Sequence, residues 1–435
     1  MKIAFFTPLT PLKSGVADFS EELLLGMKQY TDLDIDIFIG DYKPSNKEII
    51  SNFTIKKFKE FEDENVRSEY DEVIYQIGNN EQCHEEIYNM ALKYPGIIEL
   101  HDIALHHFIA ATTLARGNVD EYKRIMRYCH GVGGEKVVDR FLNQEILPPW
   151  ETDALTFTVN KEIVDAAKAI IVHSDFAKQI IKGIRPDVPV QLIYLHTPDI
   201  YEDYEEQKKS SREELNIGQD EFIISSFGFA TKTKRIKEIM QALAQVKKQG
   251  YIFKYYIAGQ ADENLQLDRV IKELGLENEV IITGFLELGH MKKLMLASDV
   301  CMALRYPSQG ESSGVLHRMF GMGKVIMVTN VTNFSEYPDD VVIKIEVEKE
   351  VDNISKNIIQ LINKPEKRDS LKKEAFKFSM DKCSLKINTM MYKNSIIHSE
   401  YTIDLKVEDI ILSKIEQLQI NDFDILSRML RILEY

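Results

Sequence analysis

A polar stretch between an apolar run and a helical pattern has the chemistry of an anion-binding loop. Residues 305–318 read Arg-Tyr-Pro-Ser-Gln-Gly-Glu-Ser-Ser-Gly-Val-Leu-His-Arg and follow the apolar run 300–304. Val315, Met319 and Met322 share one face of the helix that this pattern predicts. The N–H groups of a first helical turn lack intrahelical acceptors and the helix dipole is positive there, so a phosphate can bind. The candidate residues are Ser312, Ser313, Gly314 and Val315.

Two further loops carry similar chemistry. Ser14 and Gly15 end the first loop, just before a helical pattern. They could bind a phosphate, or Ser14 could act only as a helix N-cap. Gly228, Lys234 and Arg235 occupy the loop after an apolar run in the second half of the chain. A glycine turn followed by two cations suits a diphosphate, although such a pair can also form a solvated helix face.

Histidine supplies the remaining candidate chemistry. His101 directly follows the apolar run 97–100, which places a group of near-neutral pKa where a sugar hydroxyl or an oxyanion could meet it. His106 and His107 fit a helix cap or cover better. Neither the histidines nor the pair Asp34 and Asp36 form a metal-binding pattern at a strand's carboxyl end, so we predict no metal site and no cofactor.

These loops need a scaffold of strands and helices. Short apolar runs alternate with helical patterns throughout, which is typical of parallel sheets covered by helices on both faces. The expected strands are 3–7, 35–39, 73–77, 97–100, 170–173 and 190–194, then 222–227, 253–258, 280–282, 300–304 and 325–329. Ligands collect beyond the carboxyl ends of such strands, where every loop described above lies.

Two doubly wound α/β domains are therefore expected. The charged stretch 198–220 has no apolar run and indicates the connection between them. We predict an N-terminal Rossmann-like domain over residues 1–197 and a second one over 198–385. Amphipathic patterns at 405–418 and 423–433 predict C-terminal helices within 386–435, packed on the first domain or at a dimer surface.

Composition narrows the function classes. The 435 residues are 44% apolar, which is enough for two packed domains. A net charge of −15 argues against a general nucleic-acid binder. The four scattered cysteines fit a reducing cytoplasm, and no apolar run is long enough to span a membrane. A peripheral membrane contact stays open, although anionic lipid would repel so acidic a chain.

Taken in order, the motifs resemble the retaining glycosyltransferases of the GT-B fold, glycosyltransferase family 4. The chain looks in particular like the bacterial subgroup of polysaccharide assembly, which carries Leu-Arg-Tyr-Pro, Gly-Glu-Ser/Thr-Ser-Gly and Leu-His-Asp motifs. The resemblance covers residues 1–386 and includes 8–18, 75–79, 100–102, 172–174, 234–235, 258–259, 283–285 and 311–314. It implies two Rossmann-like domains facing a cleft. It also implies metal-independent, retaining transfer of a hexose from a nucleotide diphosphate sugar to a glycan, lipid-linked or protein acceptor.

The resemblance also implies roles for individual residues. Glu311 would bind hydroxyls of the donor sugar, and the amides of 312–315 would hold the diphosphate. Lys234, with Arg235, would neutralise the leaving phosphate. Gly284 and Phe285 would hold the base, and His101 would approach the transferred sugar from the other domain. His101, Lys234 and Glu311 are thus the implied catalytic residues.

Two positions depart from the family pattern. Phe229 follows Gly228 where many relatives have an arginine, so Arg305 or Arg235 would have to supply that charge. Met319 stands where many relatives have a second glutamate that binds the ribose, and Arg318 precedes it. These departures leave the sugar and the nucleotide open. They also favour a second hypothesis, in which the chain is a non-catalytic GT-B protein that supports a partner transferase or binds glycans. A phosphorylase or a sugar-nucleotide epimerase fits the motifs less well.

Overall fold

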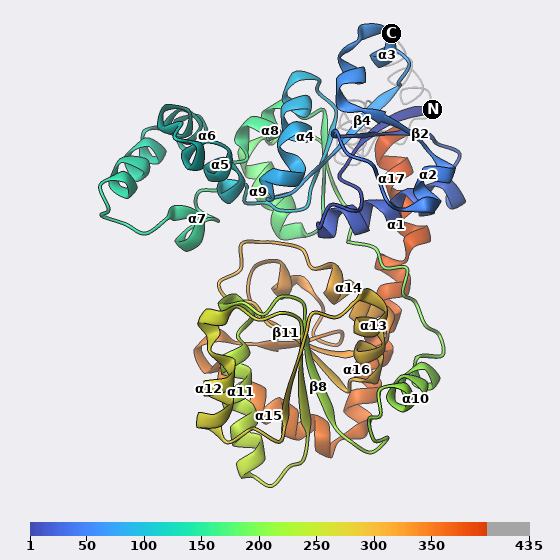
Figure 1. Ribbon diagram of the computed structural model, residues 1–435, viewed down its shortest axis with the longest axis vertical. Coiled ribbons are helices and arrows are strands. Elements are labelled where there is room, and N and C mark those ends of the chain that lie inside the picture. The colour runs from blue at the N-terminus through green and yellow to red at the C-terminus, as the bar shows by residue number, and fades with distance from the viewer. Residues whose placement is uncertain (398–435) are drawn as a thin grey trace, which may run out of the picture.

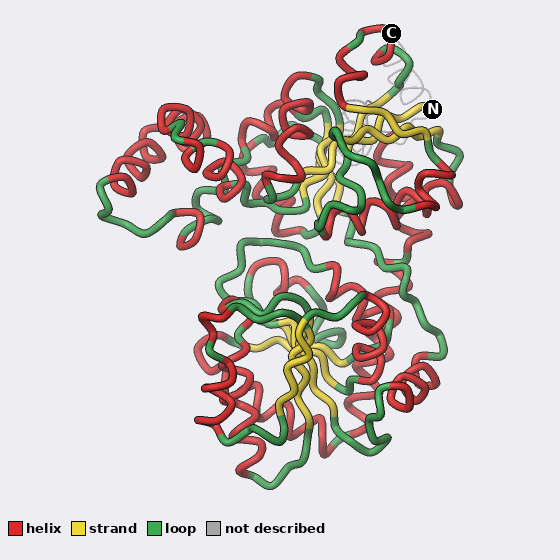
Figure 2. The backbone as a smooth tube through the Cα atoms, in the orientation of Figure 1, coloured by secondary structure: helices red, strands yellow, loops and turns green. Residues whose placement is uncertain are grey.

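The computed structural model describes residues 1–397 and shows two α/β domains with their sheets in separate halves of the molecule (Figure 1). Each sheet is parallel and has helices on both sides (Figure 2). The predicted doubly wound architecture is therefore confirmed. The predicted C-terminal helices 405–418 and 423–433 lie outside the described residues.

The first domain is built on a seven-stranded sheet of order β3-β2-β1-β4-β5-β6-β7. The strands are β1 (Lys2–Phe6), β2 (Asp34–Ile39), β3 (Thr54–Lys57), β4 (Glu72–Ile77), β5 (Ile97–Leu100), β6 (Ala169–Val172) and β7 (Val190–Leu192). The helices are α1 (Gly15–Tyr30), α2 (Lys47–Asn52), α3 (Glu64–Arg67), α4 (Glu81–Lys93), α5 (His106–Thr112), α6 (Val119–Leu142), α7 (Pro149–Thr152), α8 (Lys161–Ala166) and α9 (Asp175–Ile184). Short 3-10 turns are η1 (Phe58–Glu62) and η2 (Leu114–Arg116). Helices α6 and α7 extend away from the rest of this domain (Figure 1).

The second domain has a six-stranded sheet of order β10-β9-β8-β11-β12-β13. Its strands are β8 (Ile223–Phe227), β9 (Lys254–Ala258), β10 (Val280–Gly284), β11 (Val300–Ala303), β12 (Val325–Thr329) and β13 (Ile343–Ile345). Its helices are α10 (Tyr204–Glu214), α11 (Ile236–Lys248), α12 (Leu267–Leu274), α13 (Leu288–Ala297), α14 (Gly314–Gly321), α15 (Glu350–Asn363) and α16 (Pro365–Phe378). Short turns are η3 (Lys232–Lys234), η4 (Glu263–Leu265), η5 (Thr332–Glu336), η6 (Val347–Lys349) and η7 (Ser379–Cys383).

Burial on both faces explains why the central strands form. Four of the five residues of β1 and all five of β8 are buried, as expected for parallel strands covered by helices on each side. Each domain has two apolar clusters of buried residues. Burying a large aliphatic side chain contributes about 1.5–3 kcal/mol, so these clusters make each sheet a rigid support for its loops.

Strand order places the functional loops. In the first sheet the order reverses between the neighbours β1 and β4, and in the second between β8 and β11. Loops that leave such a pair of strands diverge to opposite faces and open a crevice at the carboxyl ends. The crevices lie at the loops after β1 and β4 in one domain, and after β8 and β11 in the other.

The predicted connection between the domains contains a helix. Helix α10 lies within 198–220 and packs against α13 of the second domain. Its Arg212 is buried, donates to the carbonyl of Ala297 at 2.9 Å, and pairs with Asp299 at 2.8 Å. Helix α10 thus packs through one buried arginine with hydrogen-bond and ion-pair partners rather than through an apolar stripe.

The chain finally returns to the first domain. Helix α17 (Leu385–Ile397) packs against α1 (Figure 1). Gly26 permits this contact, because a Cβ there would lie 2.7 Å from Cγ of Leu385. Tyr392 and Ile396 of α17 belong to an apolar cluster of the first domain. Over residues 1–397, no helix is both long and apolar enough to cross a bilayer.

Candidate functional site

Loops from both domains line one cavity of about 500 Å³. The first domain contributes Ser14, Gly15, Asn79, His101 and Asp102, among others. The second contributes Ser312, Gly314, Val315 and Arg318. The cavity therefore lies between the crevice of the first domain and the loop after β11 in the second.

The start of α14 forms the wall on the second domain. Ser313 is the N-cap, and its hydroxyl accepts a hydrogen bond from the amide of Leu316 at 3.3 Å. Nothing lies within 4 Å of the position that a Cβ on Gly314 would take, so the first turn faces open space. Its outward-pointing amides and the helix dipole can bind an anion there.

A smaller cavity of about 100 Å³ adjoins this helix start, and two cationic side chains line it. Lys234 and Arg305 line it together with Ser313 and Val315, and Val315 lines the larger cavity too. Burial, reinforced by Arg305, lowers the pKa of the Lys234 ammonium to about 7. Lys234 Nζ donates to the carbonyl of Phe227 at 2.5 Å. An anion bound at α14 would thus lie beside a lysine whose positive charge is not balanced by a carboxylate among the described ion pairs.

Gly228 makes room for that lysine. It has a φ of 81°, and a Cβ there would lie 2.8 Å from Lys234 Nζ. The neighbouring turn at Gly259 packs so closely that its own Cβ would lie 2.3 Å from the carbonyl oxygen of Gly228. Gly228 is needed for its left-handed backbone and for the room it leaves to Lys234, and Gly259 is needed for its close approach to Gly228.

Five predicted residues line neither of the two cavities, namely Gly228, Arg235, Gly284, Phe285 and Glu311. Arg235 pairs with Glu350 at 2.7 Å and with Glu238 at 3.1 Å, so two carboxylates already neutralise its charge. Gly284 ends β10, and Phe285 after it is 79% exposed. Neither residue lines either cavity. The structure therefore does not bring Arg235 to the helix start, and it leaves Phe285 as an exposed aromatic ring.

Glu311 lies in the loop before α14 but is bound within that loop. One oxygen pairs with Arg305 Nε at 3.0 Å, and the other accepts from the amide of Gln309 at 2.7 Å. A sugar hydroxyl would have to compete with these partners to reach the carboxylate. Arg318 is engaged as well, because it pairs with Glu22 of the first domain and with Asp199.

His101 approaches the cavity from the end of β5. Its Nε2 lies 2.6 Å from Oε1 of Gln76, and its ring contacts the edge of Phe19. Burial lowers the pKa of His101 well below its usual range, with the neighbouring histidines adding to the effect. His101 is thus a neutral hydrogen-bonding group over the pH range of most enzymes. Asp102 beside it accepts from the amide of Asn79 at 2.8 Å, and burial raises the pKa of Asp102 to about 6.

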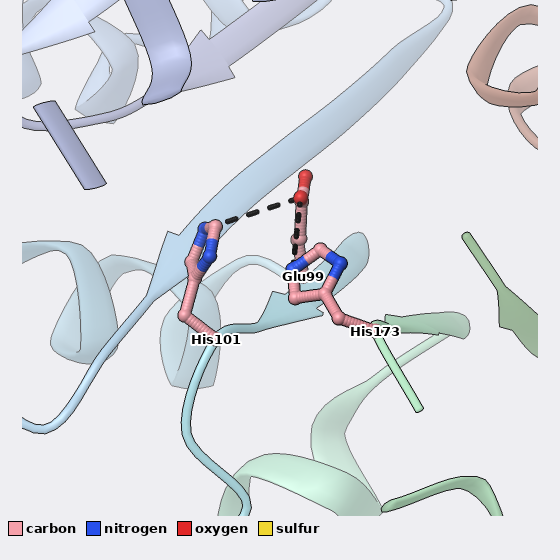
Figure 3. A group of neighbouring side chains, drawn as sticks. All are labelled: Glu99, His101 and His173. Atoms are coloured by element: carbon pink, nitrogen blue, oxygen red, sulfur yellow. Dashed lines mark ion pairs between the residues drawn. The ribbon is translucent and has the colours of Figure 1, made fainter. Parts of the chain in front are cut away.

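Glu99, His101 and His173 form a buried group behind the cavity (Figure 3). Each offers one potential ligand atom, and these atoms lie within 4.8 Å of one another. Both oxygens of Glu99 accept hydrogen bonds, one from Tyr392 and one from Gln76. Protein partners thus already satisfy the carboxylate, and we interpret the group as a hydrogen-bonded network. The expectation of no metal site stays a prediction.

Contacts across the domain boundary hold the two halves together. The Glu336 carboxylate accepts from the amides of Asp175 and Phe176, which begin α9 of the first domain. Gln309 donates to the carbonyl of Trp150 at 3.2 Å. Together with the pair of Arg318 and Glu22, these contacts come from α14, from the loop before it and from η5.

Sequence reasoning assigned no role to Gln76, Glu99, His173 or Tyr392. A signal was present for Glu99, because a carboxylate interrupts an otherwise apolar strand and such a group is rarely buried without partners. Gln76 pairs with Glu99 across neighbouring strands. Tyr392 had no local signal, since it comes from a helix far along the chain.

The second domain matches a family model of known proteins. Residues 207–378 match the model described as glycosyl transferases group 1. An uncharacterized glycosyltransferase of Methanocaldococcus jannaschii is 25% identical over 182 residues, which cover 41% of this chain and 43% of that protein. The chain therefore spans less than half the length of that curated relative.

Solved structures match nearly the whole chain and define its fold as GT-B. Anabaena HepE in complex with UDP has a TM-score of 0.62 at 16% identity, over 91% of this chain and 99% of that one. WaaG, a glycosyltransferase involved in lipopolysaccharide biosynthesis, has a TM-score of 0.58 at 14% identity, over 91% and 99%. A glycosyltransferase from Rickettsia africae has a TM-score of 0.61 at 14% identity, over 92% and 98%. The protein thus has the GT-B fold, and residues 207–378 of its second domain match the group 1 model.

Proposed function

We propose that this protein transfers a sugar from a nucleotide diphosphate sugar to an acceptor hydroxyl. The observation that carries the proposal is the start of α14, whose first turn faces the interdomain cavity with Lys234 and Arg305 beside it. Amide dipoles and two cations at one helix start match a diphosphate. The group 1 family match over the same domain supports this assignment.

We propose that the transfer at this site is retaining. The bond between the anomeric carbon and the diphosphate breaks, and the acceptor oxygen bonds to that carbon. The acceptor's proton passes to the departing phosphate on the same face, so the configuration is retained. The α14 amides and Lys234 stabilise the charge that develops on the phosphate, and the two domains hold the reactants together. The scheme needs no cofactor, and the nucleotide sugar is the donor substrate.

Uridine diphosphate is the nucleotide that we propose first, because HepE has been crystallised with UDP and with UDP-glucose. Phe285 is exposed at the end of β10 and could stack on the base. We propose a glycan or a lipid-linked molecule as the acceptor, in cytoplasmic synthesis of a cell-surface polysaccharide or glycoconjugate. A protein acceptor and a homodimer stay open.

A panel of nucleotide sugars tests the proposal. The purified protein is incubated with UDP-, GDP- and ADP-hexoses and a mixture of simple glycosides, and released nucleotide is measured. We expect nucleotide release with one donor class, and NMR of the product should show the anomeric configuration of the donor. A product of inverted configuration would support the transferase function but contradict the retaining mechanism, and Asp102 would then be the candidate base.

The alternative is a non-catalytic GT-B protein that supports a partner transferase or binds glycans. It predicts no release with any donor and no saturable nucleotide diphosphate binding by calorimetry. Saturable UDP binding without turnover would leave donor recognition intact and point to a missing acceptor.

A further inference from the structure

A chain of hydrogen bonds runs from the core of the first domain to His101. The hydroxyl of Tyr392 donates to Oε1 of Glu99, and the amide nitrogen of Gln76 donates to Oε2 at 2.5 Å. The amide oxygen of Gln76 lies 2.6 Å from His101 Nε2. Gln76, Glu99 and Tyr392 are all fully buried. In Figure 3 Glu99 lies between the rings of His101 and His173.

The sheet itself aligns this chain. Gln76 on β4 is the parallel partner of Glu99 on β5, so the two side chains leave the same face of the sheet side by side. His101 follows Glu99 by two residues and lies on that side as well. The fourth member comes from elsewhere, because Tyr392 belongs to α17, which packs across α1.

The donors and acceptors fit together in only one order when Glu99 is ionised. Both carboxylate oxygens then accept, so Gln76 must turn its amide N–H toward Glu99 and its oxygen toward His101. That oxygen needs a donor, which places the ring proton of His101 on Nε2. Nδ1 of His101 is then the nitrogen that accepts. Since His101 lines the cavity, a hydroxyl bound there meets a ring that accepts rather than donates.

We propose that Gln76, Glu99 and Tyr392 are positioning residues that hold His101 in its Nε2–H tautomer, so that Nδ1 accepts a hydrogen bond from a hydroxyl of the donor sugar. This inference rests on the proposed function for the identity of the ligand. It makes the C-terminal helix α17 part of the site, although no residue of α17 lines the cavity.

The groups facing Glu99 define how the network responds to acid. They are His101, His173 and Tyr392. Burial raises the pKa of Glu99 to about 7, and the hydrogen bonds from Tyr392 and Gln76 oppose that rise. Nδ1 of His173 donates to the carbonyl of Ile193 at 2.8 Å, and its Nε2 has no hydrogen-bond partner but lies 3.4 Å from Oε1 of Glu99. A proton on Oε1 of Glu99 would therefore find an acceptor in His173, and the neutral carboxyl would then hold the Gln76 amide less strongly through Oε2.

Two variants test the inference by two separate readouts. Glu99→Gln replaces an obligate acceptor by an amide, and Tyr392→Phe removes one donor to Glu99. The matched control is Tyr88→Phe, because the buried hydroxyl of Tyr88 has no hydrogen-bond partner among the described residues. The tautomer of His101 is measured by NMR of protein labelled with nitrogen-15 in histidine, assigned with His101→Gln. Turnover is measured against pH.

The wild type and Tyr88→Phe should show the Nε2–H tautomer at alkaline pH, where Glu99 is ionised. Glu99→Gln, whose side-chain amide can turn either its oxygen or its nitrogen to Gln76, should give a mixture of the two His101 tautomers and turn over up to about ten-fold more slowly, while UDP affinity stays unchanged because the second domain holds the diphosphate. Tyr392→Phe should raise the pKa of Glu99, so the acid limb of the rate profile should move to higher pH.

A His101 tautomer that is the same in wild type and Glu99→Gln would overturn the inference, as would an acid limb that does not move in Tyr392→Phe. Turnover by the wild type would still support the proposed function in either case. If the wild type neither binds UDP nor turns over any donor, the proposed function fails. The tautomer measurement still tests whether the hydrogen-bond network orients His101. Tyr392→Phe covers the case in which Glu99→Gln does not fold.

Discussion

Lys234 is the residue on which the proposed chemistry depends most. Its ammonium lies in a small cavity beside the start of α14, and Arg305 is a neighbouring cation. Arg305 pairs with Glu311, whereas Lys234 has no carboxylate partner among the described ion pairs. Burial lowers its pKa to about 7, because the charged form loses hydration there. A bound diphosphate would restore the favourable environment of the charged form.

The pH dependence of UDP binding follows from that shift. A diphosphate raises the pKa of Lys234, so binding takes up a proton above about pH 7 and the UDP affinity should fall as pH rises from there. Calorimetry in buffers of different ionisation enthalpy measures the uptake. Lys234→Ala should abolish it and slow turnover by about ten- to a hundred-fold. Lys232→Ala, an exposed lysine in the same turn, should change neither. Equal proton uptake in Lys234→Ala and wild type would remove Lys234 from the site.

At the scale of elements, the loops after β8 and β9 must pack tightly to aim Lys234. Gly228 has a left-handed backbone, and its missing side chain leaves room for the ammonium. The loop thus supplies the position of the cation, while helix α14 supplies the amides.

Gly228→Ala tests this arrangement. The substitution should cost about 1–2 kcal/mol of stability because of the left-handed backbone, and it should weaken UDP binding because the new methyl group displaces Lys234. Gly183→Ala in α9 is the matched control, since a Cβ there meets nothing within 4 Å and alanine should stabilise the helix by about 0.5–1 kcal/mol. Thermal unfolding and UDP calorimetry measure both variants. Unchanged UDP affinity in Gly228→Ala would contradict the role of the turn.

The central elements could be predicted from sequence because parallel strands buried on both faces leave continuous apolar runs. The sequence contained no such run for the edge strands β3 and β13, since Thr54–Lys57 is half exposed and Ile343–Ile345 has only three residues. Helix α10 was missed for a related reason, because its packing depends on one buried arginine.

The candidate site was predictable where its chemistry is local. Ser312, Ser313 and Gly314 are adjacent in sequence and begin a helix, so their pattern alone indicated an anion site. Arg235 shows the limit of this reasoning, because its partners Glu350 and Glu238 are set by tertiary packing. The partner of Glu99 on α17 is distant for the same reason, and no spacing rule could reveal it.

At the scale of the whole molecule, the switch point of the first domain faces the start of α14 across the 500 Å³ cavity. Glu336 contacts the start of α9, and Arg318 contacts Glu22, so loops near α14 hold the second domain against the first. Arg318, which precedes the departing position Met319, thus serves the domain boundary. The architecture makes the site a property of both domains and of the returning helix α17.

The crystal structure of this protein with UDP tests the central claim most directly. We predict the diphosphate at the start of α14, with its oxygens within hydrogen-bond distance of the Gly314 and Val315 amides and of Lys234 Nζ. UDP bound elsewhere on the molecule, or an empty helix start at a UDP concentration that saturates binding in solution, would contradict the account.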